Sequence, residues 1–262
     1  RIAAYASVID AVTADPRTIL MAREGAAAQS SSPGAGAPGI WLLPSSARAS
    51  GVNAFWTTDL VLMNTSPESA SVKVKFLGHE GTGASGPEKD LTTPAMATLS
   101  IPDVLSTEFG KTRDWGPILI RSSLATITAH GQTWTASPSG GTYGQSVPAL
   151  GASEAVGARP MALAGLRQDD RFRTNIVLAN MREIEAVVTL EVLQEDGTTV
   201  TNHTVTVGPL GFSQLNLADH LGVTDFTGGS VLVSSSTAGA QIVAYASVID
   251  GTTADPRTIL AR

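Results

Sequence analysis

The chain has 262 residues, of which 42% are hydrophobic, so it can bury one large core or two of ordinary size. Charged residues make up only 15% and the formal net charge is −6, so there is no basic field for phosphates and we expect no nucleic-acid partner. The lack of cysteine excludes disulfides, thiolate metal sites and a cysteine nucleophile. It fits either the cytosol or an exported bacterial protein that avoids thiols.

No apolar run reaches about 18 residues, so we expect no membrane span. The chain begins at Arg1 rather than at methionine and carries no signal-like segment, so we expect a processed or excised piece of a longer protein.

Residues 1–23 are predicted to form an N-terminal strand and hairpin. The Asp15–Pro16 step favours a turn, and residues 18–20 are typical of a short returning strand. Residues 24–39 hold almost no large side chain, which predicts a flexible linker. The alternation of the first strand gives one side with Ile2, Ala4, Ala6 and Val8 and another with Tyr5, Ser7 and Ile9.

Residues 40–150 are predicted to form a first β-sandwich. The segment 71–77 alternates strictly, which directs Val72, Val74 and Phe76 inward and Lys73 and Lys75 outward. We expect further extended segments at 55–64, 91–101, 117–122 and 125–134, a glycine-rich turn at 78–90 and a short helix or turn at 102–109. No long helix is expected.

Residues 160–262, after a linker at 151–159, repeat the first body. With a constant shift from Thr58 to Thr174, the segment TDLVLMN (58–64) aligns with TNIVLAN (174–180), and Gly81 aligns with Gly197. Each unit holds about seven short strands with frequent turn signals. We therefore predict an all-β fold: two tandem antiparallel β-sandwich domains of immunoglobulin-like type with an additional N-terminal β-hairpin. A jelly-roll arrangement stays open.

Residues 241–260, near the end of the second body, match residues 1–20 at sixteen of twenty positions. A hairpin of this kind completes the sheet of one body, and two bodies need only two of them. The hairpin at residues 1–20 is therefore surplus, and a strand without a partner is a template for pairing with another sheet. Three placements are open. The hairpin is the tail of a preceding repeat or a local extra edge, it joins the sheet of a neighbouring chain, or it clamps the two bodies of its own chain together.

Residues typical of catalysis or metal binding are scattered. None of the histidines, His79, His130, His203 and His220, has a partner at metal-ligand spacing, and no G-x-S-x-G elbow occurs. Asp10 with Asp15, and Asp250 with Asp255, fall short of the six to eight oxygens that calcium prefers, so turn capping is the favoured interpretation. We predict no enzyme and no cofactor.

Aromatic residues could form a sugar-stacking platform, which makes polysaccharide an alternative partner. Core filling is the simpler interpretation, because Trp56 aligns with Phe172 in the repeat. Two glycosylation sequons begin at Asn64 and Asn202. The aromatic residues considered are Trp56, Trp115, Trp134, Tyr143 and Phe172.

Four segments carry a resemblance: FWTTDLVLMN at 55–64, FRTNIVLAN at 172–180, GTYGQSVPA at 141–149 and AYASVIDGTTADP at 244–256. Together they resemble tandem β-sandwich repeat modules of secreted bacterial proteins, over almost everything after Ile40. The resemblance implies an extracellular or cell-surface, non-catalytic module with a structural or adhesive role.

The sequence thus predicts a filament subunit that assembles with copies of itself, head to tail, by β-strand donation from residues 1–20. The alternative is a glycan- or substrate-binding accessory module of a larger secreted protein. The predicted assembly strand uses Ile2, Ala4, Tyr5, Ala6, Val8 and Ile9.

Overall fold

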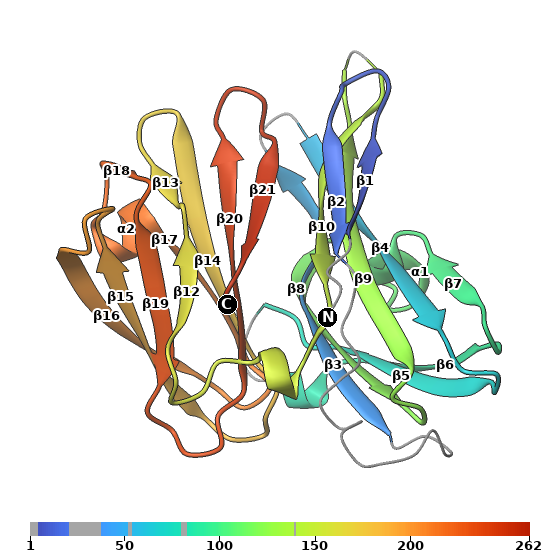
Figure 1. Ribbon diagram of the computed structural model, residues 1–262. Coiled ribbons are helices and arrows are strands. Elements are labelled where there is room, and N and C mark those ends of the chain that lie inside the picture. Colours follow the sequence, from blue (N-terminus) through green and yellow to red (C-terminus); the bar gives the residue numbers. More distant parts are fainter. Residues whose placement is uncertain (1–4, 21–37, 52–53, 80–82, 139) are drawn as a thin grey trace. The chain divides into compact units, whose positions relative to one another are not determined.

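The computed structural model describes residues 5–20, 38–51, 54–79, 83–138 and 140–262 (Figure 1). The chain divides into two compact units, Arg1–Gly78 with Gly86–Ser153 and His79–Ser85 with Glu154–Arg262. The predicted linker at 24–39 lies outside the described residues except for its last two positions. Ile2 and Ala4 also lie outside them.

The first unit is an antiparallel sandwich preceded by the hairpin of β1 (Tyr5–Ile9) and β2 (Pro16–Leu20). Its main sheet has the strand order β10-β9-β4-β3-β8-β5-β6, with β7 added on β4 and β11 on β3. The strands are β3 (Gly39–Gly51), β4 (Ala54–Asn64), β5 (Ala70–Phe76), β6 (Glu88–Thr93), β7 (Thr98–Ile101), β8 (Asp114–Ser122), β9 (Ile127–Ala136), β10 (Thr142–Pro148) and β11 (Leu150–Gly151).

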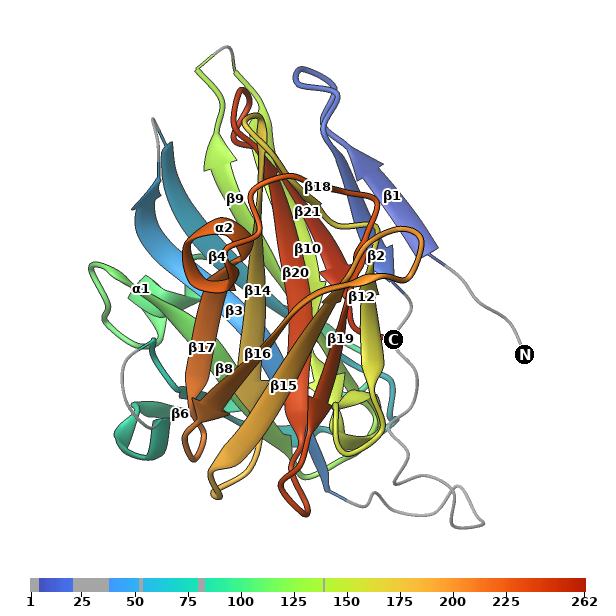
Figure 2. The same ribbon diagram turned by 90° about the vertical axis from the view of Figure 1, so that its left-hand side faces the viewer.

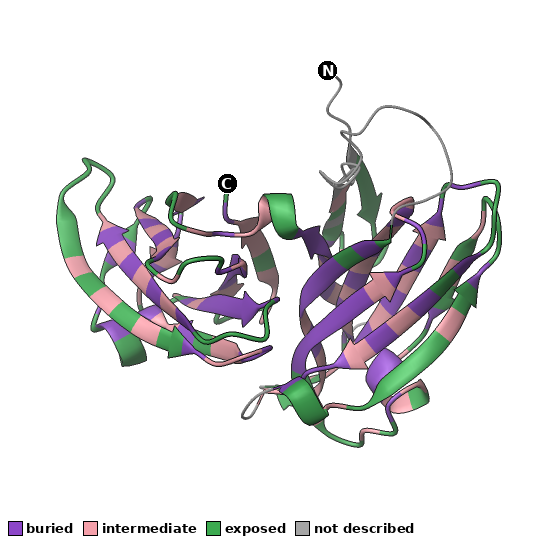
Figure 3. Cartoon of the chain, turned by 90° about the horizontal axis from the view of Figure 1, so that it is seen from below, coloured by how far each residue is buried: buried purple, intermediate pink, exposed green. Residues whose placement is uncertain are grey.

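The alternation predicted for β5 is confirmed. Val72, Val74 and Phe76 are buried in the core that β5 and β8 share with β4 and β9. Lys73 and Lys75 face outward, where they form ion pairs with carboxylates of the neighbouring strand β6. A half-buried sheet therefore follows directly from the period-two pattern. Figure 3 shows the same alternation of buried and less buried residues along strands of both bodies.

Two features of the first unit differ from the sequence prediction. The segment 91–101, expected as one extended piece, contains the end of β6, a turn in which Met96 has a φ of 51°, and β7. β6 pairs with β5 whereas β7 pairs with β4, so the turn carries the chain from one layer to the other. Strand β3 was not predicted; it pairs with both β8 and β4 and joins the two layers into one folded sheet.

The second unit is a two-sheet antiparallel sandwich around its own core. One sheet has the order β12-β19-β15-β16, the other β17-β14-β20-β21, and β13 pairs with β18. The strands are β12 (Met161–Ala164), β13 (Arg167–Gln168), β14 (Phe172–Asn180), β15 (Ala186–Leu193), β16 (Thr199–Val207), β17 (Phe212–Asn216), β18 (Phe226–Thr227), β19 (Ser230–Ser235), β20 (Ile242–Asp250) and β21 (Pro256–Leu260).

Helical segments are short. The expected short helix at 102–109 is α1 (Val104–Thr107), and its counterpart in the second body is α2 (Leu217–Leu221). Asn216 caps α2 by accepting hydrogen bonds from two backbone amides, and Gly222 ends it in a left-handed conformation. Two 3-10 turns lie at Gly83–Ser85 and Ala152–Glu154. Among the described residues, no helix has the length and hydrophobicity needed to cross a membrane.

The repeat seen in the sequence is also a repeat of buried polar contacts. The side-chain amide of Asn64 donates to the carbonyls of Glu68, Thr93 and Pro94. In the second body the amide of Asn180 donates in the same way to Ile184, Val207 and Gly208. Both asparagines are fully buried, so the Asn64 sequon is inaccessible to a glycosyltransferase in the folded protein.

Candidate assembly site

The two hairpins of repeated sequence have the same local structure. In β1 and β2, Tyr5 lies opposite Leu20, and in β20 and β21, Tyr245 lies opposite Leu260. The register is the same along both hairpins. Both turns contain an amide-to-carbonyl bond of 2.8 Å, from Ala14 to Asp10 and from Ala254 to Asp250, and both alanines have positive φ, 56° and 60°.

The N-terminal hairpin meets the first body through its turn, at the tip where β9 passes into β10 (Figure 1). The backbone amide of Thr142 donates to the carboxylate of Asp10 (3.0 Å), and the amide of Gly144 donates to that of Asp15 (2.9 Å). The hydroxyl of Thr13 donates to the carbonyl of Thr142 (2.8 Å). We call residues 137–138 and 140–144 the docking tip.

Gly141 brings the docking tip into close contact with the hairpin. Its φ is 73°, and a Cβ at this position would lie 2.5 Å from the Asp10 carboxylate and 3.0 Å from the side chain of Thr13. A side chain at this position would have to displace the Asp10 carboxylate, so glycine is favoured both by the backbone conformation and by the close approach of the hairpin. The conspicuous GTYGQ segment of the sequence thus contacts the hairpin turn of its own chain.

The carboxylate of Asp10 organises the turn as well as the contact. Backbone hydrogen bonds from Thr13 and then from Val12, supported by Thr142, lower the pKa of Asp10 to about 2. The corresponding Asp250 has its pKa lowered chiefly by the guanidinium of Arg171, which donates to it at 2.8 Å. The carboxylate of this turn is therefore hydrogen-bonded to a neutral residue of the first body in one case and to a cation of the second body in the other.

The C-terminal hairpin completes a sheet, as Figure 2 shows for the neighbouring strands β14, β20 and β21. β20 pairs with β14 over nine residues, from Asp250 opposite Phe172 to Ile242 opposite Asn180. One side of β20 lies in the core of the second body, and Ile259 of β21 packs against that core. We call this place, between β14 and the core, the β14 slot. The side chains of β20 in the core are Ile242, Ala244, Ala246 and Val248.

The N-terminal hairpin has no such surroundings. Among the described residues, β1 pairs only with β2 and the two form a sheet of their own. Val8 is 50% exposed and Ile9 62%, whereas Val248, the counterpart of Val8, is 4% exposed. Ala6 is also exposed. Of the predicted assembly residues, Ile2, Ala4 and the side chain of Tyr5 lie outside the described part.

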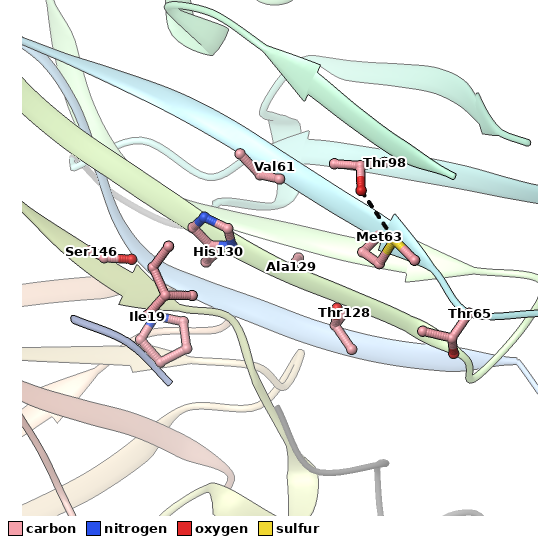
Figure 4. Close-up of a pocket in the computed structure, with 10 residues that line it drawn as sticks. Ile19, Val61, Met63, Thr65, Thr98, Thr128, Ala129, His130 and Ser146 are labelled. Carbon is pink, nitrogen blue, oxygen red and sulfur yellow. Dashed lines mark hydrogen bonds between the residues drawn. The ribbon is translucent and has the colours of Figure 1, made fainter. Parts of the chain in front are cut away.

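A groove of about 430 Å³ lies on the outer face of β4 and β9, and Ile19 of the hairpin forms part of its lining (Figure 4). Val61, Met63 and Pro148 give it an apolar surface, and His130 lies at its centre. Burial lowers the pKa of His130, so the ring is neutral at physiological pH. The other described lining residues are Thr65, Thr98, Thr128, Ala129 and Ser146, and the described lining holds no Trp, Tyr or Phe.

The other residues considered for chemistry have structural contacts. Among the described residues, no group of three His, Asp or Glu side chains could hold a metal ion. The indole of Trp134 donates to Asp59, and the Phe172 ring lies under the guanidinium groups of Arg167 and Arg171. Trp56 and Phe172 are both half-buried, and Phe172 packs against the core of the second body, in agreement with the core-filling interpretation for Phe172.

Comparisons with known proteins give no family for this chain. No protein-family model matches, and no curated protein matches. Among solved structures, Thermotoga maritima 1070 is 16% identical with a TM-score of 0.35, covering 44% of this chain and 94% of that protein.

Two glycoside hydrolase family 2 enzymes are also similar at a low level. A β-galacturonidase from Eisenbergiella tayi is 10% identical with a TM-score of 0.21, covering 100% of this chain and 43% of the enzyme. A member from Bacteroides cellulosilyticus is 10% identical with a TM-score of 0.22, covering 93% and 32%. This chain spans less than half the length of either enzyme.

Proposed function

We propose that the chain is a non-catalytic structural protein whose N-terminal hairpin links copies head to tail by β-strand donation. One observation carries the proposal: Val8 is half exposed, whereas Val248, in the same local structure, is buried in a core. Full burial of a valine side chain contributes about 1.5–3 kcal/mol, and β1 also has a strand edge to offer. Contacts of this head-to-tail kind need not close into a ring, so they build fibres.

An extracellular or cell-surface location belongs to the same proposal. It is supported by the resemblance to repeat modules of secreted bacterial proteins and by the absence of cysteine, which leaves no thiol to oxidise outside the cell. Adhesion between cells or to a surface is the role that a fibre of such modules would serve.

The groove favours a second candidate, a glycan- or substrate-binding accessory module. Hydroxyl groups of Thr98, Thr128 and Ser146 line it beside His130. Sugar-binding sites usually add aromatic rings to such groups. We rank this candidate second because the described lining has none. Binding to immobilised polysaccharide that is lost on His130→Ala would favour it.

Sedimentation and electron microscopy of the purified chain test the proposal. We expect polymers whose length grows with protein concentration, and we expect only monomers when residues 1–20 are deleted. Polymers that persist in the deleted chain would show that another surface links the copies. Monomers from the intact chain at every concentration would refute strand donation.

A further inference from the structure

We propose that the β14 slot of a second copy accepts the N-terminal hairpin, and that residue 251 decides which hairpin fills the slot. The inference rests on the proposed strand donation and names its acceptor. The partner is another copy of this chain, because the slot already holds a hairpin of nearly the same sequence. Association would be an exchange in which a donated hairpin replaces the resident one.

The strand edge of the hairpin fits the slot residue by residue. In the second body, Ser247 lies opposite Asn175 and Val248 opposite Thr174. Because both hairpins have the same internal register, β1 placed in the slot would bring Ser7 opposite Asn175. In the described chain, β1 pairs only with β2, so its other edge can form this ladder.

The side chains that would enter the core are the same in both hairpins. Ala246 and Val248 lie in the core of the second body and Ile259 packs against it, and the N-terminal hairpin carries Ala6, Val8 and Ile19 at these places. Volume and shape are therefore conserved at these three places, and the core accepts the same side chains without a cavity or overpacking. One further difference lies outside this core: Val243 of β20 is fully buried, and the N-terminal hairpin has the smaller Ala3 at that place.

One of the four differences between the hairpins faces the wall of the slot. The amide of Gly251 donates to the carbonyl of Arg171 at 2.7 Å. A Cβ at residue 251 would lie 2.8 Å from that backbone oxygen, closer than side-chain carbons normally approach. The N-terminal hairpin has Ala11 at this place. The resident hairpin therefore fits better than the donated one, which limits exchange between copies.

The chain lacks cysteine, so introduced cysteines report the pairing directly. Facing residues of antiparallel strands have Cα atoms about 4.5–5.5 Å apart, which suits a disulfide. In the full chain, Ser7→Cys with Asn175→Cys should give disulfide-linked dimers and longer species under mild oxidation, in amounts that rise with concentration. The matched control, Ser247→Cys with Asn175→Cys, should give a disulfide within the monomer.

The second test exchanges the two residues at the turn. The variant adds Ala11→Gly and Gly251→Ala to the cysteine pair at positions 7 and 175. The donated hairpin then lacks the Cβ that would lie too close to the Arg171 carbonyl, and the resident hairpin carries it instead. We expect the linked fraction to rise about tenfold at equal concentration, as relief of one overpacked contact allows. An unchanged fraction would refute the role of residue 251.

The outcomes separate this inference from the proposed function. Polymers in sedimentation without a Ser7–Asn175 link would mean that strand donation occurs at another edge, and this inference is wrong. Monomers without any link would refute both. A disulfide between positions 7 and 175 that forms only within single chains would show pairing inside one molecule. That result would contradict a second copy as the acceptor.

Discussion

The two hairpins of this chain share their sequence, register and turn, yet one is buried and the other is exposed. Val8 and Val248 occupy the same place in the same local structure, but one lies at the surface and the other in a core. Local sequence therefore determines the hairpin, whereas burial depends on whether a strand such as β14 lies beside it. This comparison identifies residues 5–20 as the part of the molecule with unused binding capacity.

A matched pair of charge substitutions should give the largest difference between the hairpins. Val248→Asp buries an uncompensated carboxylate and should lower the free energy of unfolding by about 3–5 kcal/mol. Val8→Asp lies at the surface of the monomer and should change it by less than about 0.5 kcal/mol. Urea denaturation of dilute protein measures both. Equal losses would mean that Val8 is buried in the isolated chain.

The buried asparagines allow the two bodies to be compared directly. Asn64→Ala and Asn180→Ala each leave three backbone carbonyls without the amide that donates to them. Each substitution should cost about 1–3 kcal/mol, because a buried acceptor that loses its donor has no replacement. Urea denaturation should show similar losses. A neutral effect in one body would show that water replaces the amide there.

A glycine pair tests the contact of the N-terminal hairpin with the docking tip. Gly141 and Gly165 both have positive φ, but an added Cβ would meet neighbouring residues at Gly141 and nothing within 4 Å at Gly165. Gly165→Ala should cost about 1 kcal/mol, from backbone strain alone. Gly141→Ala adds a collision with Asp10 and should release the hairpin, seen as faster proteolysis within residues 5–20. Equal protection in both variants would mean that the hairpin is not held at the docking tip.

Acid should weaken the contact between the N-terminal hairpin and the docking tip, and we expect this effect to be the smallest of those predicted. The pKa of Asp10 is lowered from 3.8 to about 2, so its carboxylate stabilises the docked turn above pH 3.8. That stabilisation is lost as the pH falls through 2. The protection of the Thr142 amide, which is its hydrogen-exchange rate relative to the intrinsic rate at the same pH, should fall over this window, and Asp10→Asn should remove that fall. Protection that is unchanged at pH 2 would contradict the role of Asp10.

Much of the fold could be predicted because it depends on patterns that are visible in the sequence. The alternation of residues 71–77 identified β5, and the internal repeat identified the two bodies. Strand β3 was missed because its pattern is irregular: Leu42 and Leu43 are adjacent and both fully buried, and the pairing shifts before Ser46. The split of 91–101 depends on a turn at Met96 that propensities do not signal.

The candidate site was only partly visible in the sequence. Duplication identified residues 1–20 as surplus, but nothing local showed that Thr142 and Gly144 receive their turn, because those contacts join segments more than 120 residues apart. The sequence assigned no site to any of the histidines, yet His130 is half-buried in the groove. Gly251 resembles any turn glycine until its distance to the Arg171 carbonyl is known.

Light scattering of the intact chain and of Val8→Asp over a concentration series tests the central claim most directly. The account predicts that the intact chain rises above its monomer mass of 26.9 kDa as concentration increases, while Val8→Asp stays at that mass. If both proteins keep the monomer mass throughout, or if both associate equally, the exposed hairpin is not a strand donor.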